Sequence, residues 1–166
     1  MVGLLVGLLV DWLIGWLVEL VDWLEMMTTI KRFEDLECWQ EARELVRSVY
    51  SLTQNEKFKA DFELKNQVKR SAISVMANIA EGFHRKTNKD FMKFLDYARS
   101  SAAETLSHFY IALDQDYITP AELDHTKGRI DNVWKKINGL IAYLNRFEST
   151  KLKSLAEEIQ NFGNTV

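Results

Sequence analysis

The sequence contains little proline and glycine: one proline, Pro120, and seven glycines in 166 residues, three of them among the first fifteen. These residues interrupt helices most strongly, so nearly all of the remaining chain can be helical. A single cysteine, Cys38, excludes an intrachain disulfide and any site built from several cysteines, and it suits a reducing compartment. These shortages predict an all-α protein with one ordinary core.

Basic residues are missing from the first 26 residues, although the whole chain has 21 lysines and arginines. Four of the 24 acidic residues lie in this segment, so residues 27–166 carry 21 basic and 20 acidic side chains and a net charge of +1. The composition changes at Met26 and Met27, and Met27 has the position of an original initiator methionine. We therefore predict that residues 1–26 were added in front of an existing chain, which is typical of an engineered fusion.

Small or acidic residues recur at about every fourth position of residues 1–26, with leucine, valine, isoleucine or tryptophan between them. On a helix they occupy an arc of about 160° at 100° per residue. The candidate membrane and oligomer contacts are this stripe and the tryptophans on its border: Gly3, Gly7, Asp11, Trp12, Gly15, Trp16, Glu19, Asp22 and Trp23. Twenty-four helical residues measure roughly 36 Å, which is enough to cross a hydrocarbon core of about 30 Å.

Several kinds of helix are possible interpretations of this segment. The segment does not have the features of a signal peptide, because no basic region precedes the apolar run and no small-residue cleavage site follows it. Interfacial helices usually carry lysine and arginine on the polar face, where this segment has only acids. A helix that spans or associates with a membrane, with its stripe facing other copies, fits better and makes lipid or detergent an expected partner. A soluble coiled seam, which the spacing of Val10, Ile14 and Leu17 allows, remains the alternative.

Four long amphipathic helices are predicted after the junction, because apolar residues recur there at spacings of three and four. We expect these helices, and a short tail helix after them, over residues 35–52, 61–81, 87–113, 120–147 and 152–162. Thr87 and Thr119 are expected to cap the third and fourth helices, and Pro120 to occupy a first helical position. Gly82 is expected to end the second helix in a left-handed conformation. The polar residues 54–60 are predicted as a turn.

Short turns between helices of this length predict an up-down-up-down four-helix bundle over residues 27–148, followed by a marginal helical tail over residues 149–166. With the hydrophobic N-terminal helix added, the chain is expected to have three parts. The second helix of the bundle is expected to be central, because small side chains on its inner face let neighbouring helices come close.

Several short motifs of the bundle are specific. They are Phe33-Glu34-Asp35-Leu36, Asn78-Ile79-Ala80-Glu81-Gly82-Phe83 and Arg85-Lys86-Thr87-Asn88-Lys89-Asp90-Phe91. Over about residues 30–147 they resemble the ribosomal-RNA intervening-sequence proteins, a family of four-helix bundles. This resemblance implies a homo-oligomer, usually a pentamer, without known enzymatic activity. The bundle also resembles the accessory bundle of diversity-generating retroelements, which implies binding of nucleic acid or reverse transcriptase.

Two Glu-x-x-His pairs have the spacing of ligands in di-iron bundles: Glu81 with His84, and Glu122 with His125. In an up-down bundle these pairs lie at opposite ends of the third helix, roughly 40 Å apart at 1.5 Å per residue. One metal centre cannot use both pairs. We predict no catalytic residue, no cofactor and no metal site.

Arg85, Lys86, Lys89 and Lys93 are close in sequence and are the candidate contacts for nucleic acid. In an oligomer such turns would form a cationic rim suited to phosphate, although a net charge of +1 is low for a dedicated nucleic-acid-binding domain. The sequence therefore favours a non-enzymatic, homo-oligomeric scaffold, with a cytoplasmic bundle and a membrane-associated N-terminal helix. A nucleic-acid-binding accessory protein that acts through the basic rim is the alternative.

Overall fold

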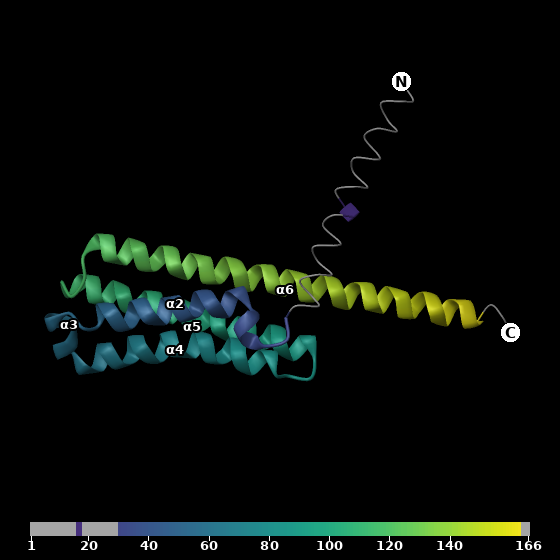
Figure 1. Ribbon diagram of the computed structural model, residues 1–166, viewed down its shortest axis with the longest axis horizontal. Coiled ribbons are helices and arrows are strands. Elements are labelled where there is room, and N and C mark those ends of the chain that lie inside the picture. Colours follow the sequence, from purple (N-terminus) through teal and green to yellow (C-terminus); the bar gives the residue numbers. More distant parts are fainter. Residues whose placement is uncertain (1–15, 18–29, 164–166) are drawn as a thin grey trace, which may run out of the picture. The chain divides into compact units, whose positions relative to one another are not determined.

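The computed structural model describes residues 16–17 and 30–163, and side-chain surroundings as far as Thr150 (Figure 1). Every regular element in these ranges is a helix, which confirms the predicted all-α class. The elements are η1 Phe33–Asp35, α2 Glu37–Leu52, α3 Glu56–Ala60, α4 Phe62–Phe83, α5 Asn88–Asp114 and α6 Pro120–Gly163. The chain forms two compact units, Met1–Leu36 and Glu37–Val166.

The second unit is a four-helix bundle. Helices α2, α4, α5 and α6 alternate in direction along the bundle (Figure 1). α4 packs against α2 and α5, and α6 packs against the same two helices, so that each long helix has two long neighbours. The predicted up-down-up-down arrangement is confirmed.

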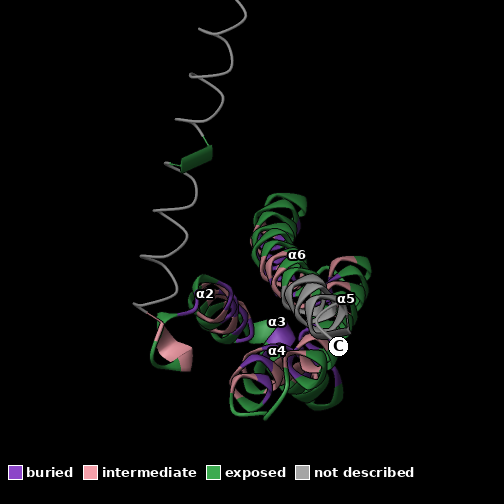
Figure 2. Cartoon of the chain, turned by 90° about the vertical axis from the view of Figure 1, so that its right-hand side faces the viewer, coloured by how far each residue is buried: buried purple, intermediate pink, exposed green. Residues whose placement is uncertain are grey.

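The core follows the three-and-four spacing seen in the sequence, with buried residues on the inner sides of the long helices (Figure 2). Small buried side chains, such as Ala72 on α4 and Ala98 and Ala102 on α5, let the helices approach closely. Larger apolar side chains that are fully buried fill the space between them. They include Leu45, Val49, Val68, Val75, Ile79, Leu95, Phe109, Ile130, Val133 and Ile137.

The predicted N-terminal caps are present. Asp90 N–H donates to Thr87 Oγ1 at 3.1 Å at the start of α5. At the start of α6, Glu122 N–H donates to Thr119 Oγ1 at 3.3 Å, and Thr119 N–H donates to Glu122 Oε2 at 2.7 Å. This reciprocal pair is a capping box, and Pro120 follows it as the first residue of the helix. Local sequence thus fixes where these two helices begin.

The segment expected to be only a turn, residues 54–60, contains the short helix α3. Asn55 caps α3 by accepting a hydrogen bond from Lys57 N–H at 3.0 Å. Phe58 from α3 is fully buried, with its ring centroid 6.4 Å from that of Phe109 and 5.6 Å from that of Tyr117. The prediction of a turn is wrong here, because one buried aromatic side chain outweighs the polar composition around it.

The fourth bundle helix does not end near Phe147, as expected, but continues as α6 to Gly163. Neither proline nor glycine lies between Gly139 and Gly163, so no residue in this part of the chain breaks the helix. The separate tail helix expected over residues 152–162 is therefore the last part of α6.

The N-terminal segment lies largely outside the described residues, together with the predicted junction at Met26 and Met27. Trp16 and Leu17 are described, and both are helical and exposed. The other candidate residues of that segment, all outside the described ranges, are Gly3, Gly7, Asp11, Trp12, Gly15, Glu19, Asp22 and Trp23. Among the described residues, no helix is both long and apolar enough to cross a membrane.

Candidate functional site

The turn between α4 and α5 brings together the four basic residues that the sequence singles out. Arg85 and Lys86 lie in the turn itself, Lys89 in the first turn of α5, and Lys93 one helical turn further on. All four are exposed. Between positions 81 and 93 the chain has four basic and two acidic residues, so this end of the bundle is locally cationic although the bundle as a whole is nearly neutral.

Backbone hydrogen bonds hold this turn in one conformation. His84 N–H donates to the carbonyl of Glu81 at 3.2 Å, and Arg85 N–H donates to the carbonyl of Gly82 at 3.0 Å. On the other side, the Thr87 cap fixes the start of α5. Both ends of the turn are therefore fixed by hydrogen bonds, and its basic side chains are exposed.

Gly82 is a buried residue within α4 and not the left-handed terminator that the sequence predicts. No glycine in the described part of the chain has a positive φ, and α4 continues to Phe83. A Cβ atom at Gly82 would lie 2.7 Å from Phe94 Cβ and 2.8 Å from Phe91 Cδ2. This glycine is required for the close approach of α5, which places the half-buried Phe94 next to the turn.

Two aromatic rings in contact with each other lie beside the turn, and a basic side chain contacts each of them. Arg85 Cζ lies 4.4 Å from the centroid of the Phe94 ring. The Phe94 and Tyr97 rings meet edge to face, with centroids 5.6 Å apart, and Lys93 Nζ lies 5.9 Å from the Tyr97 centroid. Both cations are within the range of cation–π attraction. We call Arg85, Lys93, Phe94 and Tyr97 the aromatic-basic cluster.

The charges of this region are only partly compensated. Arg85 forms an ion pair with Glu81, one helical turn earlier, and both side chains are exposed. Lys86, Lys89 and Lys93 form no ion pair with any carboxylate among the described residues. The N-terminus of α5 adds a partial positive charge at the same place. The region can therefore attract an anion such as a phosphate group.

Sequence reasoning missed the aromatic half of the cluster. Neither Phe94, which is half-buried, nor Tyr97, which is 45% exposed, was among the predicted contacts. The available signal was two aromatic residues three positions apart, directly after Lys93. This spacing puts both rings on one side of a helix.

Other lysines on α4 do not join this site. Lys65 Nζ lies 4.3 Å from the centroid of the Phe62 ring, near the start of α4. Lys69 Nζ lies 4.5 Å from the centroid of the Tyr50 ring on α2. These lysines belong to the half of α4 that is remote from the turn (Figure 1).

The two Glu-x-x-His pairs lie at opposite ends of α5, as the sequence predicts. Glu81 and His84 are at the α4–α5 turn, and Glu122 and His125 are at the start of α6 (Figure 1). Within the described ranges, no three His, Cys, Asp or Glu side chains are placed to hold a metal ion. Burial raises the pKa of the Cys38 thiol to about 12, so this thiol is protonated at neutral pH.

Comparisons with known proteins agree with this fold. The family described as 23S rRNA-intervening sequence protein matches residues 34–139. A crystal structure of a protein with unknown function from the S23 ribosomal protein family of Bacteroides thetaiotaomicron VPI-5482 is similar, with a TM-score of 0.57 and 23% identity; the match covers 63% of this chain and 97% of that chain. No curated protein matches the chain. The turn and both aromatic residues of the cluster lie inside the matched range.

Proposed function

The chain belongs to the 23S rRNA-intervening sequence protein family, and from this premise we propose that it is a non-enzymatic protein that binds single-stranded RNA at the α4–α5 turn. The observation that supports the proposal is the aromatic-basic cluster, together with the neighbouring lysines Lys86 and Lys89. In this proposal the lysines and Arg85 contact phosphates, and Tyr97 stacks on a base. The description of the family refers to ribosomal RNA, which favours RNA over DNA.

Single strands are bound where cations follow the backbone and aromatic rings stack on successive bases. The cluster provides both within about one and a half turns of α5. Tyr97 offers an exposed ring, and Phe94 supports that ring from the side. Arg85 is oriented in advance by its contacts with Phe94 and Glu81, which lowers the entropy lost when it binds a phosphate.

The size of the cluster favours single strands over duplexes. Double-stranded RNA is usually recognised across about 16 base pairs and two minor grooves, which needs a long surface. From Asn88 to Tyr97, α5 extends only about 15 Å at 1.5 Å per residue. This length suits a segment of a few nucleotides. Bases in such a segment are already unstacked and available to Tyr97.

Fluorescence anisotropy with the full chain and a labelled single-stranded RNA of about ten nucleotides tests this proposal. Tyr97→Ala should weaken binding by about tenfold, since a base–aromatic stack is lost. Tyr110→Ala is a matched control, because Tyr110 lies on the same helix and is also 45% exposed. Equal effects of the two substitutions, or no binding of the RNA at low salt, would contradict the proposal.

A second candidate function is a homo-oligomeric scaffold, with the pentamer implied by the family resemblance as the expected assembly. Two exposed aliphatic side chains favour it: Ile73 on α4 is 43% exposed and Ile111 on α5 is 45% exposed. Such side chains are often covered by another copy of the chain. Light scattering with the full chain should give a mass of several copies, and Ile73→Asp with Ile111→Asp should reduce it. A monomeric wild-type chain would exclude this function.

In a scaffold of this kind, each copy would also bring its N-terminal segment into the assembly. The association of residues 1–26 with lipid or detergent stays a prediction from their sequence. Flotation of the full chain with neutral vesicles at pH 5 and pH 8 tests it. The carboxyl groups of the stripe should enter lipid more readily when they are protonated, so more protein should float at pH 5. A full chain that stays with the soluble fraction at both pH values would contradict the prediction.

A further inference from the structure

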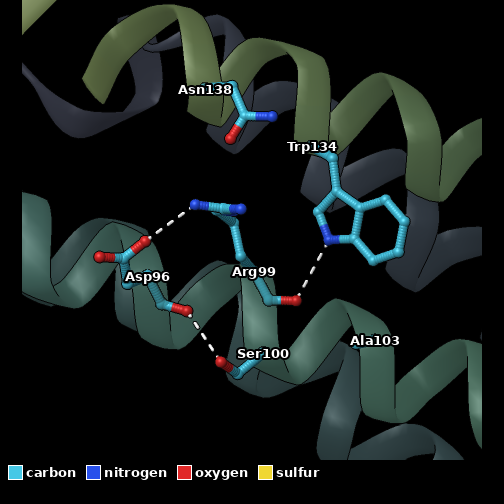
Figure 3. A pocket seen from close by; sticks show the side chains of 6 residues that line it. All are labelled: Asp96, Arg99, Ser100, Ala103, Trp134 and Asn138. Atoms are coloured by element: carbon cyan, nitrogen blue, oxygen red, sulfur yellow. Dashed lines mark hydrogen bonds and ion pairs between the residues drawn. The ribbon is translucent and has the colours of Figure 1, made fainter. Parts of the chain in front are cut away.

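A pocket of about 530 Å³ lies between α5 and α6 (Figure 3). Its residues on α5 are close in sequence to those of the aromatic-basic cluster. Its volume is within the range of about 300–1,000 Å³ that is common for small-molecule sites. The lining has one large aromatic ring, four polar side chains and one alanine. The residues are Asp96, Arg99, Ser100 and Ala103 from α5, and Trp134 and Asn138 from α6.

Trp134 provides a fixed ring at one side of the pocket. Its Nε1–H donates to the backbone carbonyl of Arg99 at 3.1 Å, which ties α6 to α5 and sets the orientation of the indole (Figure 3). Since this N–H is the only polar group of the side chain, the remaining surface of the indole is apolar. A rigid, half-buried ring of this kind suits stacking by a flat ligand.

The other side of the pocket is polar but carries no net charge. Arg99 Nη1 donates to Asp96 Oδ1 at 3.0 Å, which leaves other guanidinium N–H groups and the second carboxylate oxygen for a ligand. The Asn138 amide extends toward the Arg99 guanidinium (Figure 3). It forms no hydrogen bond with any residue in the described ranges, so both its donor and its acceptor are available.

These groups select a neutral, planar ligand. The Arg99–Asp96 pair has no net charge, so it gives no net attraction to an anion or a cation, whereas a neutral ring with donors and acceptors on its edges can bond to both side chains. We propose that this pocket binds a nucleobase, and guanine in particular, stacked on Trp134. The N1–H and N2–H groups of guanine would donate to Asp96, and its O6 and N7 atoms would accept from Arg99 or Asn138.

The pocket and the aromatic-basic cluster meet at Lys93. This residue is three positions before Asp96 and four before Tyr97, so its side chain borders both sites on the surface of α5. An RNA strand held at the turn could therefore place a guanine in the pocket. That extension rests on the proposed function, whereas binding of an isolated nucleoside to the pocket does not.

Saturation-transfer NMR and calorimetry with the full chain and free guanosine test the pocket directly. Asn138→Ala should weaken guanosine binding by about three- to tenfold, because one hydrogen-bonding partner is lost. Asn138 is exposed and makes no hydrogen bond to a described residue, so this change should not disturb folding. Asn132→Ala is the control, since Asn132 is exposed on the same helix and does not line the pocket.

Asp96→Asn should reduce the preference for guanosine over uridine, because the amide keeps one acceptor oxygen but replaces the other with an NH2 donor and so accepts less well from both N1–H and N2–H of guanine. Absence of guanosine binding, or unchanged binding in both Asn138→Ala and Asp96→Asn, would overturn the proposal. Guanosine binding without RNA binding would support the pocket and contradict the proposed function. RNA binding without any binding of guanosine would support the turn and contradict the pocket.

Discussion

Gly82 and Phe94 lie so close together that position 82 has no room for a side chain. A Cβ atom added there would lie 2.7 Å from Phe94 Cβ. The contact joins the end of α4 to the second turn of α5. It therefore sets the position of Phe94, which lies next to Arg85 on one side and Tyr97 on the other. A single glycine thus places the aromatic-basic cluster at the turn.

Gly82→Ala should destabilise the bundle by about 1–3 kcal/mol, because the added methyl group forces α4 and α5 apart. This loss should exceed the gain of up to about 1 kcal/mol that alanine brings to a helix. Gly139→Ala is the matched control: Gly139 is also helical, and a Cβ atom there would meet nothing within 4 Å. Urea denaturation of both variants measures the difference. A Gly82→Ala variant as stable as Gly139→Ala would show that the contact is not tight.

A buried hydroxyl pair joins α4 and α5 in the middle of the bundle. Thr105 Oγ1 lies 2.9 Å from Ser71 Oγ on α4 and also 2.9 Å from the Ser101 carbonyl in its own helix, and its single proton serves both acceptors. Ser71 Oγ donates to the Val68 carbonyl at 3.0 Å. Thr105→Val keeps the shape and removes the bond between the helices, so it should cost about 1 kcal/mol of unfolding free energy.

Thr126→Val is the control for this change. Thr126 is equally buried, but its hydroxyl donates to the Glu122 carbonyl within its own helix, at 2.9 Å. That carbonyl can still accept the backbone hydrogen bond of the helix, so the loss should be smaller. Equal losses in the two variants, measured by thermal or urea unfolding, would show that the bond between α4 and α5 contributes no more to stability than a bond within one helix.

Cys38 should be unreactive while the bundle is folded. The residue is 2% exposed, and burial raises the pKa of its thiol to about 12, above the ordinary value of 9.0. A disulfide reagent at pH 8 should therefore react only after unfolding. Because the folded pKa is raised, this group stabilises the fold fully below pH 9, and the contribution is lost as pH rises from about 9 toward 12.

Between pH 8 and pH 10, the Cys38→Ala variant should lose less unfolding free energy than the wild-type chain, because it has no thiol to ionise. Urea denaturation at the two pH values measures this difference. Fast labelling of the native wild-type chain at pH 8 would contradict the burial of the thiol.

Features that depend on local sequence were predictable. The spacing of apolar residues located the four long helices, and Thr87, Thr119 and Pro120 located the starts of two of them. These features need only the chain near each residue, because caps and amphipathic periodicity act within a turn or two. The four basic residues of the turn were likewise visible as a run in the sequence.

Features that depend on contacts between helices were not predictable in the same way. Gly82 has the sequence position of a helix terminator, and only its contact with Phe94 on α5 shows why it is buried within α4. Phe58 is surrounded by polar residues, so its burial against Phe109 gives no periodic signal. Tyr97 becomes a candidate contact only once the packing of α5 shows which of its sides stays exposed.

The salt dependence of RNA binding tests most directly whether the α4–α5 turn binds a nucleic-acid backbone. For single strands, each phosphate contact contributes about 0.7 to the slope of log K against log salt concentration. Replacement of Lys86, Lys89 and Lys93 by glutamine should therefore make the slope shallower by about 2, while Lys135→Gln on α6 should leave it unchanged. An identical slope for the wild-type chain and the triple variant would contradict RNA binding at this turn.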